Sequence, residues 1–305
     1  MKKVIVTGAS GFIGRHSLIP LIKAGYEVHA VFNTRKPLDI EHRLLFWHKC
    51  DILKPEEQKN LLKEVQASHL LHFAWYATHS KFWTSNENLL WVAASIGLIM
   101  NFAEHGGSRV VCAGTCAEYD WNYGFCTEDV TPVRPSTLYG VCKNSFRSMS
   151  EQFFMQAGIS NAWGRIFLLY GPHECSARLV ASVIRALLLK EPALCSSGTQ
   201  LRDFLYIEDA ACAFVSLLDS NIQGPVNIAS GQPVRLKDVA ELIAEKIGKK
   251  ELLRLGSLSL SADDPPLLLA NIIRLKNEVG WIPKYDLNTG LDLTIKWWKS
   301  FLSQD

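Results

Sequence analysis

The sequence predicts an α/β fold in which a doubly wound parallel sheet of the Rossmann type is followed by a smaller C-terminal α/β lobe. From residue 3 to about residue 170, short β-branched runs alternate with longer segments of helical periodicity, the pattern of consecutive βαβ units. After Tyr170-Gly171-Pro172 this rhythm loosens, and glycine, proline and serine interrupt further helical segments. With 305 residues, 48% of them hydrophobic, the chain can bury a sizeable core.

Five buried strands and four helices are expected in the first part of the chain. The strands are short apolar runs, and the helices repeat apolar residues every three or four positions. The expected strands span residues 3–6, 27–32, 69–73, 109–113 and 161–167, and the expected helices span residues 12–24, Pro55–Val65, 83–105 and 139–157.

The second part of the chain is expected to form the smaller lobe. Helices are predicted over residues 177–189 and Leu236–Ile247, and a third over 207–218 that packs back onto the sheet. We therefore expect a dinucleotide-binding domain over residues 1–170, joined by residues 203–228, and a second lobe built mainly from residues 171–305. No linker rich in proline or serine separates the two parts.

Composition and charge narrow the range of partners. A formal net charge of +2 gives no reason to expect nucleic acid or a membrane surface, and a small ligand is favoured. Neither a signal-peptide core nor a membrane-spanning run is present, which predicts a cytoplasmic protein. The eight cysteines form no Cys-x-x-Cys pair and the nine histidines are scattered, so no metal site is expected.

A glycine-rich loop follows the first expected strand and opens the first helix. It reads Thr7-Gly8-Ala9-Ser10-Gly11-Phe12-Ile13-Gly14. Gly8 permits a tight turn, Gly11 lets the backbone approach a pyrophosphate, and Gly14 allows close packing of helix on strand. An anion would then rest on free N–H groups at the helix N-terminus. This loop predicts a dinucleotide-binding site, although its first two glycines are one residue further apart than in the usual fingerprint.

The end of the second strand indicates which dinucleotide is bound. An acidic residue there hydrogen-bonds the ribose of NAD, whereas an arginine accommodates the extra phosphate of NADP. The segment here contains Asn33, Arg35 and Lys36 and no carboxylate, which favours NADP(H) over NAD(H). Further along, Asp51 and Ile52 follow a third strand-like run, where Asp51 is placed to face the adenine.

A phenol and an ammonium are spaced for acid–base chemistry. Tyr139 and Lys143 are four residues apart, which places them one turn apart on one helix face. A nearby cation lowers the pKa of a phenol, so Tyr139 could exchange a proton with a substrate hydroxyl or carbonyl. Thr115 ends an earlier strand, where ligands bind in open α/β sheets, and is placed to hydrogen-bond the same substrate oxygen.

Together these segments resemble the extended short-chain dehydrogenase/reductases that process nucleotide sugars, and the resemblance spans nearly the whole chain. Beyond the residues above, it includes Arg165 through Tyr170-Gly171-Pro172, the block Ser197–Asp209 with Arg202-Asp203-Phe204, Asn227-Ile228-Ala229-Ser230-Gly231, and Gly280-Trp281 with Pro283-Lys284.

The resemblance implies roles for further residues. Phe73, Ala74 and Trp75 would line the cofactor path, and Asn88 would lie on the central helix near the active site. Lys143 would also hold the nicotinamide ribose. The diphosphate of a nucleoside-diphosphate sugar would bind Arg202, with Arg178 as a second contact; the alternative for Arg202 is an ion pair with Asp203 or Asp209. Members often form homodimers through helices matching residues 83–105 and 139–157.

Three reactions share this scaffold, namely dehydration, epimerisation and keto reduction. Dehydratases of the family have an Asp-Glu pair after the catalytic threonine, whereas this chain has Cys116-Ala117, with Glu118 one place on. Because Arg35 favours NADPH, the sequence predicts a reductase that transfers hydride to C4 of a nucleoside-diphosphate 4-keto-6-deoxyhexose, with Tyr139 as proton donor. The alternatives are a 4-epimerase that retains NAD(P) and a non-catalytic NADP-binding sensor. The expected sugar contacts are Cys116 and also His79, which lies in the loop 76–82.

Overall fold

The computed structural model describes residues 1–37, 39–259 and 264–303 and consists of two unequal lobes. Its larger lobe contains a seven-stranded sheet with the strand order β11-β7-β5-β4-β1-β2-β3, and every neighbouring pair is parallel. The order reverses between β1 and β4, which is where a doubly wound sheet binds its ligand. The predicted fold class is therefore confirmed.

The first part of the chain supplies six of these strands and their helices. In chain order the elements are β1 (Lys2–Thr7), α1 (Phe12–Lys23), β2 (Tyr26–Phe32), β3 (Leu45–Lys49), α2 (Pro55–Val65), β4 (His69–His72), α3 (Glu87–Glu104), β5 (Arg109–Thr115), the short 3-10 helices η1 (Cys116–Glu118) and η2 (Trp121–Tyr123), β6 (Phe125–Cys126), α4 (Leu138–Ala157) and β7 (Ser160–Ile166).

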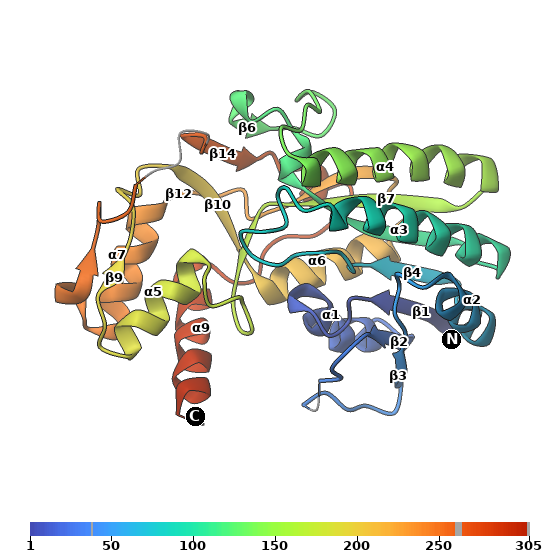
Figure 1. Ribbon diagram of the computed structural model, residues 1–305, viewed down its shortest axis with the longest axis horizontal. Coiled ribbons are helices and arrows are strands. Elements are labelled where there is room, and N and C mark those ends of the chain that lie inside the picture. Colours follow the sequence, from blue (N-terminus) through green and yellow to red (C-terminus); the bar gives the residue numbers. More distant parts are fainter. Residues whose placement is uncertain (38, 260–263, 304–305) are drawn as a thin grey trace.

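The second part builds the smaller lobe, on the left of Figure 1, and returns once to the large sheet. Its elements are β8 (Leu168–Tyr170), α5 (Leu179–Leu188), β9 (Ala193–Leu194), β10 (Leu201–Tyr206), α6 (Ile207–Asp219), β11 (Gly224–Ile228), β12 (Pro233–Arg235), α7 (Leu236–Ile247), η3 (Lys250–Leu252), β13 (Leu253–Arg254), β14 (Leu267–Ala270), α8 (Ile273–Asn277) and α9 (Leu287–Leu302). Strand β11 pairs with β7, and α6 packs on α1 beneath the sheet.

Helices cover both faces of the large sheet. Helices α2, α3 and α4 pack side by side on one face, and α1 and α6 pack on the other (Figure 1). The hydrophobic core under α1 and α6 continues without a break into α5, α7 and α9. The two lobes therefore share one core, which explains why no linker separates them in the sequence.

The expected boundaries lie within two residues of the structure, except at the start of the helix predicted over 83–105. The helix predicted over 83–105 begins at Glu87, because the Asn88 amide donates hydrogen bonds to the carbonyls of Phe82 (2.7 Å) and Ser85 (2.8 Å) and holds the preceding residues in a turn. The strand predicted over 161–167 ends at Ile166, and β8 begins two residues later and pairs with β10. Among the described helices, none is long and apolar enough to cross a membrane.

Candidate active site

The glycine-rich loop has no room for side chains at its first and third glycines. Gly8 has φ +67°, and a Cβ there would lie 2.8 Å from Ala74 N, where the chain leaves β4. A Cβ on Gly14 would overlap the Gly8 carbonyl. Helix α1 begins at Phe12 with no acidic residue in its first turn, so its N–H groups present partial positive charge. These residues form a cradle suited to a pyrophosphate.

The ends of β2 and β3 form the neighbouring part of the site. Asn33 and Arg35 are exposed, whereas Ile52 is buried. Asp51 accepts a hydrogen bond from Leu53 N (3.0 Å), so its carboxylate stabilises the turn before α2.

A carboxylate that the sequence did not indicate lies nearby. Asp39 forms an ion pair with Arg15 of α1 at 2.6 Å. A carboxylate is therefore present seven residues beyond the end of β2, and its charge is balanced by Arg15.

Thr115 and Tyr139 lie at the carboxyl edge of the sheet. Thr115 ends β5, and Tyr139 is in the first turn of α4, which Thr137 caps by accepting a hydrogen bond from Gly140 N (3.1 Å). The rings of Phe82 and Trp83 contact Tyr139 edge-on, with centroids 4.8 and 5.7 Å away. Burial raises the pKa of Tyr139, while the Thr115 side chain and Arg178 act to lower it. Burial therefore favours the neutral phenol.

Lys143 lies one turn further along α4 and is buried. Its ammonium donates to the carbonyl of Ala113 (2.9 Å) and lies 3.9 Å from the centroid of the Trp75 ring. Burial lowers the pKa of Lys143 to about 7. The sequence predicted that Lys143 would lower the pKa of Tyr139. In the structure the groups that do so are Thr115 and Arg178, because the Lys143 ammonium is directed to Ala113 and Trp75.

Two of the residues assigned to the cofactor path support Lys143. The Trp75 indole N–H donates to the Asn88 side-chain oxygen (2.8 Å), and Asn88 is fully buried. Asn88 therefore fixes the ring that faces the Lys143 ammonium. Phe73 contacts Phe214 of α6 edge-on at 4.9 Å, and Ala74 N donates to the Thr7 hydroxyl (3.3 Å), which joins β4 to β1.

Glu118 lies directly after Cys116-Ala117, the two positions that hold an Asp-Glu pair in the dehydratases, and it is completely buried. One carboxylate oxygen accepts hydrogen bonds from Thr115 N and the Trp163 indole N–H, both at 2.8 Å. The other accepts from Arg165 Nε at 2.8 Å, and the Arg165 guanidinium stacks over Tyr119. Both oxygens are occupied, so Glu118 fixes the backbone of Thr115 and is not free for elimination chemistry.

The residues expected to bind substrate approach Tyr139 from both lobes. Arg178 precedes α5, and its charge acts to lower the pKa of Tyr139. Burial lowers the pKa of His79, with a smaller contribution from Arg178, and the His79 Nδ1 is buried without a partner among the described residues. Cys116 is buried, and burial raises the pKa of its thiol to about 12, so it contributes a neutral surface.

Arg202 has a partner that the sequence did not indicate. Its guanidinium pairs with Asp264 at 2.5 Å and donates to the Pro265 carbonyl (2.7 Å). The alternative prediction, an ion pair of Arg202 with Asp203 or Asp209, was wrong. Asp203 accepts hydrogen bonds from Ser230 and Gly231, and Asp209 accepts them from the backbone of Lys284 and Tyr285. These two aspartates stabilise turns in the smaller lobe.

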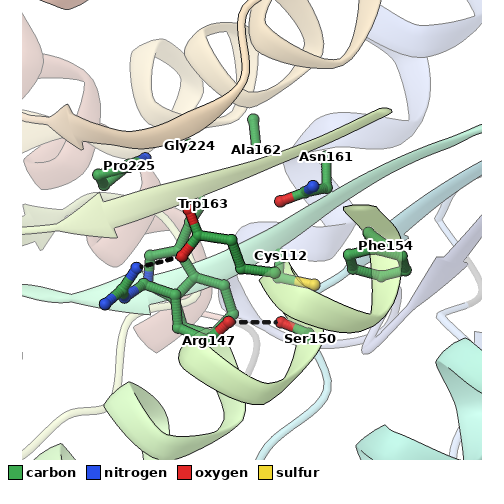
Figure 2. Close-up of a pocket in the computed structure, with 10 residues that line it drawn as sticks. Cys112, Arg147, Ser150, Phe154, Asn161, Ala162, Trp163, Gly224 and Pro225 are labelled. Carbon is green, nitrogen blue, oxygen red and sulfur yellow. Dashed lines mark hydrogen bonds and ion pairs between the residues drawn. The ribbon is translucent and has the colours of Figure 1, made fainter. Parts of the chain in front are cut away.

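Two hollows differ in what they can hold. One, of about 400 Å³, opens beside Ser10, Gly11 and Phe12 and extends to α9, a volume in the range of small-molecule sites. The other, shown in Figure 2, lies between α4 and the sheet, where Ser150 donates to the Arg147 carbonyl (2.9 Å). Its volume is about 10 Å³, which suits a single water at most.

Within the described ranges, no group of three or more histidine, cysteine or acidic side chains could hold a metal.

Sequence reasoning missed several groups at this site. Phe82, Trp83 and Asp39 had no motif to identify them. Glu118 was noted only as a possible catalytic acid, and its pairing with Arg165 depends on neighbouring strands. Glu174, which lines the larger hollow, lies two residues after the motif Tyr170-Gly171-Pro172. Its burial distinguishes it, and the sequence pattern did not indicate that burial.

Comparison with known proteins is consistent with this geometry. Residues 4–229 match the model of the "NAD dependent epimerase/dehydratase family". UDP-glucuronic acid decarboxylase 1 of Xenopus tropicalis is 27% identical over 99% of this chain and 73% of its own. UDP-glucuronate 4-epimerase of Thermodesulfobacterium geofontis is 25% identical over 97% and 95%. The solved structure of MoeE5 with UDP-glucose and NAD is 29% identical, with a TM-score of 0.85 over 98% of this chain and 99% of that one.

Proposed function

The chain belongs to the NAD-dependent epimerase/dehydratase family, and from this premise we propose that it is a nucleotide-sugar 4-epimerase that retains its nicotinamide cofactor through the reaction cycle. It is an enzyme of the extended short-chain dehydrogenase/reductase type. The observation that supports the proposal most directly is the placement of Thr115 and Tyr139 at the carboxyl edge of the sheet, with the buried carboxylate of Glu118 engaged by Arg165.

The proposal replaces the reductase reading as the main hypothesis. Among relatives, UDP-glucuronate 4-epimerase and the UDP-glucuronic acid decarboxylases are similar over nearly the whole chain. An epimerase that returns its hydride needs no net supply of reduced cofactor.

This chain's residues supply the proton transfer and the orientation of the sugar. When bound, the nicotinamide would accept a hydride from C4 of the sugar and return it to the opposite face. Tyr139 would exchange the proton of the C4 hydroxyl, and the Thr115 hydroxyl would hydrogen-bond the same oxygen. Arg178, whose charge acts on both Tyr139 and His79, would hold an anionic part of the substrate.

We further propose NAD as the cofactor. NAD is bound in the MoeE5 structure, and the ion pair with Asp39 leaves Arg15 no unpaired charge for a 2′-phosphate. The nucleotide released from purified protein by acid should therefore be NAD. Release of NADP would restore the preference that Arg35 suggested from the sequence.

Turnover of UDP-sugars tests the proposed reaction. With UDP-glucose and UDP-glucuronate as substrates, NMR of the sugar should show the C4 epimer accumulating. The nicotinamide absorbance should show no net change. Release of carbon dioxide from UDP-glucuronate would instead show a decarboxylase. Stoichiometric oxidation of NADPH with a 4-keto-6-deoxy sugar would show a reductase, and either result would contradict the proposal.

We also propose a homodimer formed through α3 and α4. Their outer faces expose apolar side chains that remain uncovered in one chain, among them Leu90 (56% exposed) and Met155 (69% exposed). Replacing Leu90 with lysine should convert the dimer to a monomer in light scattering. Leu258→Lys, at an equally exposed position in the smaller lobe, is the matched control and should leave the mass unchanged.

A further inference from the structure

The larger hollow lies where the two lobes meet, beside the glycine-rich loop. A series of aromatic rings crosses it, from Phe12 to His16 (6.3 Å), His16 to His173 (6.0 Å), and His173 to Trp297 of α9 (4.6 Å). Trp297 in turn stacks on Phe301 at 5.0 Å. This arrangement holds the turn that follows β8 against the N-terminus of α1.

Glu174 in that turn is the polar side chain that stands out. It is 5% exposed and lines the hollow together with Gly11 and Phe12. Its Oε2 has no hydrogen-bond partner among the described residues. A buried polar atom left without a partner costs about 1–3 kcal/mol, so its retention calls for a ligand or another explanation.

The backbone fixes Glu174 in this place. His173 has φ +68°, in the left-handed region that a residue with a side chain rarely adopts. The Glu174 N–H donates to the Gly171 carbonyl at 3.3 Å. This turn holds the Glu174 side chain at the hollow that it lines.

The charges around Glu174 favour an anionic ligand. Arg15 of α1 and Arg185 of α5 line the same hollow, and the charge of Arg178, at the N-terminal end of α5, acts on Glu174. Arg15 is paired with Asp39. The pKa values of both His16 and His173 are lowered to about 4, mainly by burial, so these histidines are neutral at pH 7. The net charge around Glu174 is therefore positive.

Glu174 itself is set up to donate a hydrogen bond. Burial raises the pKa of its carboxyl to about 8, against the opposing effects of Arg178 and a backbone hydrogen bond at Gly171. Below that pH the group is a neutral acid with one O–H donor. A neutral acid can approach an anion that a carboxylate would repel.

We propose that Glu174 binds the diphosphate of the dinucleotide cofactor, donating a hydrogen bond from the smaller lobe to phosphate oxygens that rest on the N-terminus of α1. This inference rests on the proposed function and extends it, because both lobes then hold the cofactor. Its consequence is that the nucleotide cannot leave without separating the turn at residues 171–176 from the phosphate loop. That is what retention through a cycle of hydride removal and return requires.

Binding of NAD⁺ to cofactor-stripped protein, measured by calorimetry from pH 6.5 to pH 9.5, tests this inference. Glu174→Ala should weaken binding at pH 7 by about 10- to 100-fold, the range for a hydrogen bond to a charged group. Glu174→Gln keeps a donor and should stay within about threefold of wild type at pH 7. Glu191→Ala, at an exposed glutamate after α5, is the matched control and should bind like wild type.

The pH profile separates this role from a merely structural one. Because the protonated acid is the form that binds, wild-type affinity should fall as pH rises above about 8, by up to tenfold per pH unit. Glu174→Gln cannot lose its donor, so this fall should disappear. Equal pH profiles for wild type and Glu174→Gln, or unchanged affinity in a folded Glu174→Ala, would overturn the inference. Failure of the wild-type protein to bind either NAD⁺ or NADP⁺ would overturn the proposed function and this inference together.

Discussion

Replacing Tyr139 with phenylalanine should reduce turnover of the nucleotide sugar by about 10²- to 10⁴-fold, the usual contribution of a positioned proton donor or acceptor. The substitution removes one hydroxyl and leaves the ring, which Phe82 and Trp83 hold edge-on. Cofactor affinity should therefore change by less than threefold. Steady-state kinetics with parallel NAD⁺ titrations would measure both quantities.

The matched control for Tyr139 is Tyr123→Phe. Tyr123 is 57% exposed in η2 and should be replaceable without effect on turnover. If Tyr139→Phe kept more than a tenth of wild-type turnover, Tyr139 would not be the proton-transfer group. A loss of NAD⁺ binding equal to the loss of turnover would show that the hydroxyl acts in cofactor binding instead.

The parts of the site that the sequence predicted depend on local geometry. The spacing of Gly8, Gly11 and Gly14 encodes a turn and a helix start, and both are present. Tyr139 and Lys143 share a helix, so their separation follows from helical periodicity. Parallel βαβ order likewise places Thr115 at the ligand-binding edge of the sheet.

Other features depend on contacts between distant segments. Lys143 is directed to Ala113 and Trp75, and neither neighbour follows from its place on α4. Arg178 and His79 are 99 residues apart in the chain, yet the charge of Arg178 acts on His79. Arg202 pairs with Asp264, 62 residues further along. Spacing within a motif carries no information about such partners.

The largest stability change is expected from Glu118→Ala. Glu118 and Arg165 form an ion pair whose side chains are 0% and 1% exposed. Removing the carboxylate would leave the Arg165 guanidinium buried without its counter-charge and deprive Thr115 N and the Trp163 indole of their acceptor. Loss of one partner of a buried pair typically costs about 3–5 kcal/mol in the free energy of unfolding. Denaturant titrations followed by circular dichroism would measure this loss.

A comparison with an exposed ion pair isolates the effect of burial. Glu245 pairs with Lys250 on the surface, where both side chains are 65% exposed, and Glu245→Ala should unfold like wild type. The same experiment decides what Glu118 does in the reaction. If Glu118 supplied a proton for elimination, the folded fraction of Glu118→Gln would lose activity. We expect the folded fraction of Glu118→Gln to turn over sugar normally, because the neutral amide still accepts a hydrogen bond from Thr115 N. The free energy of unfolding should fall, because Arg165 loses its counter-charge.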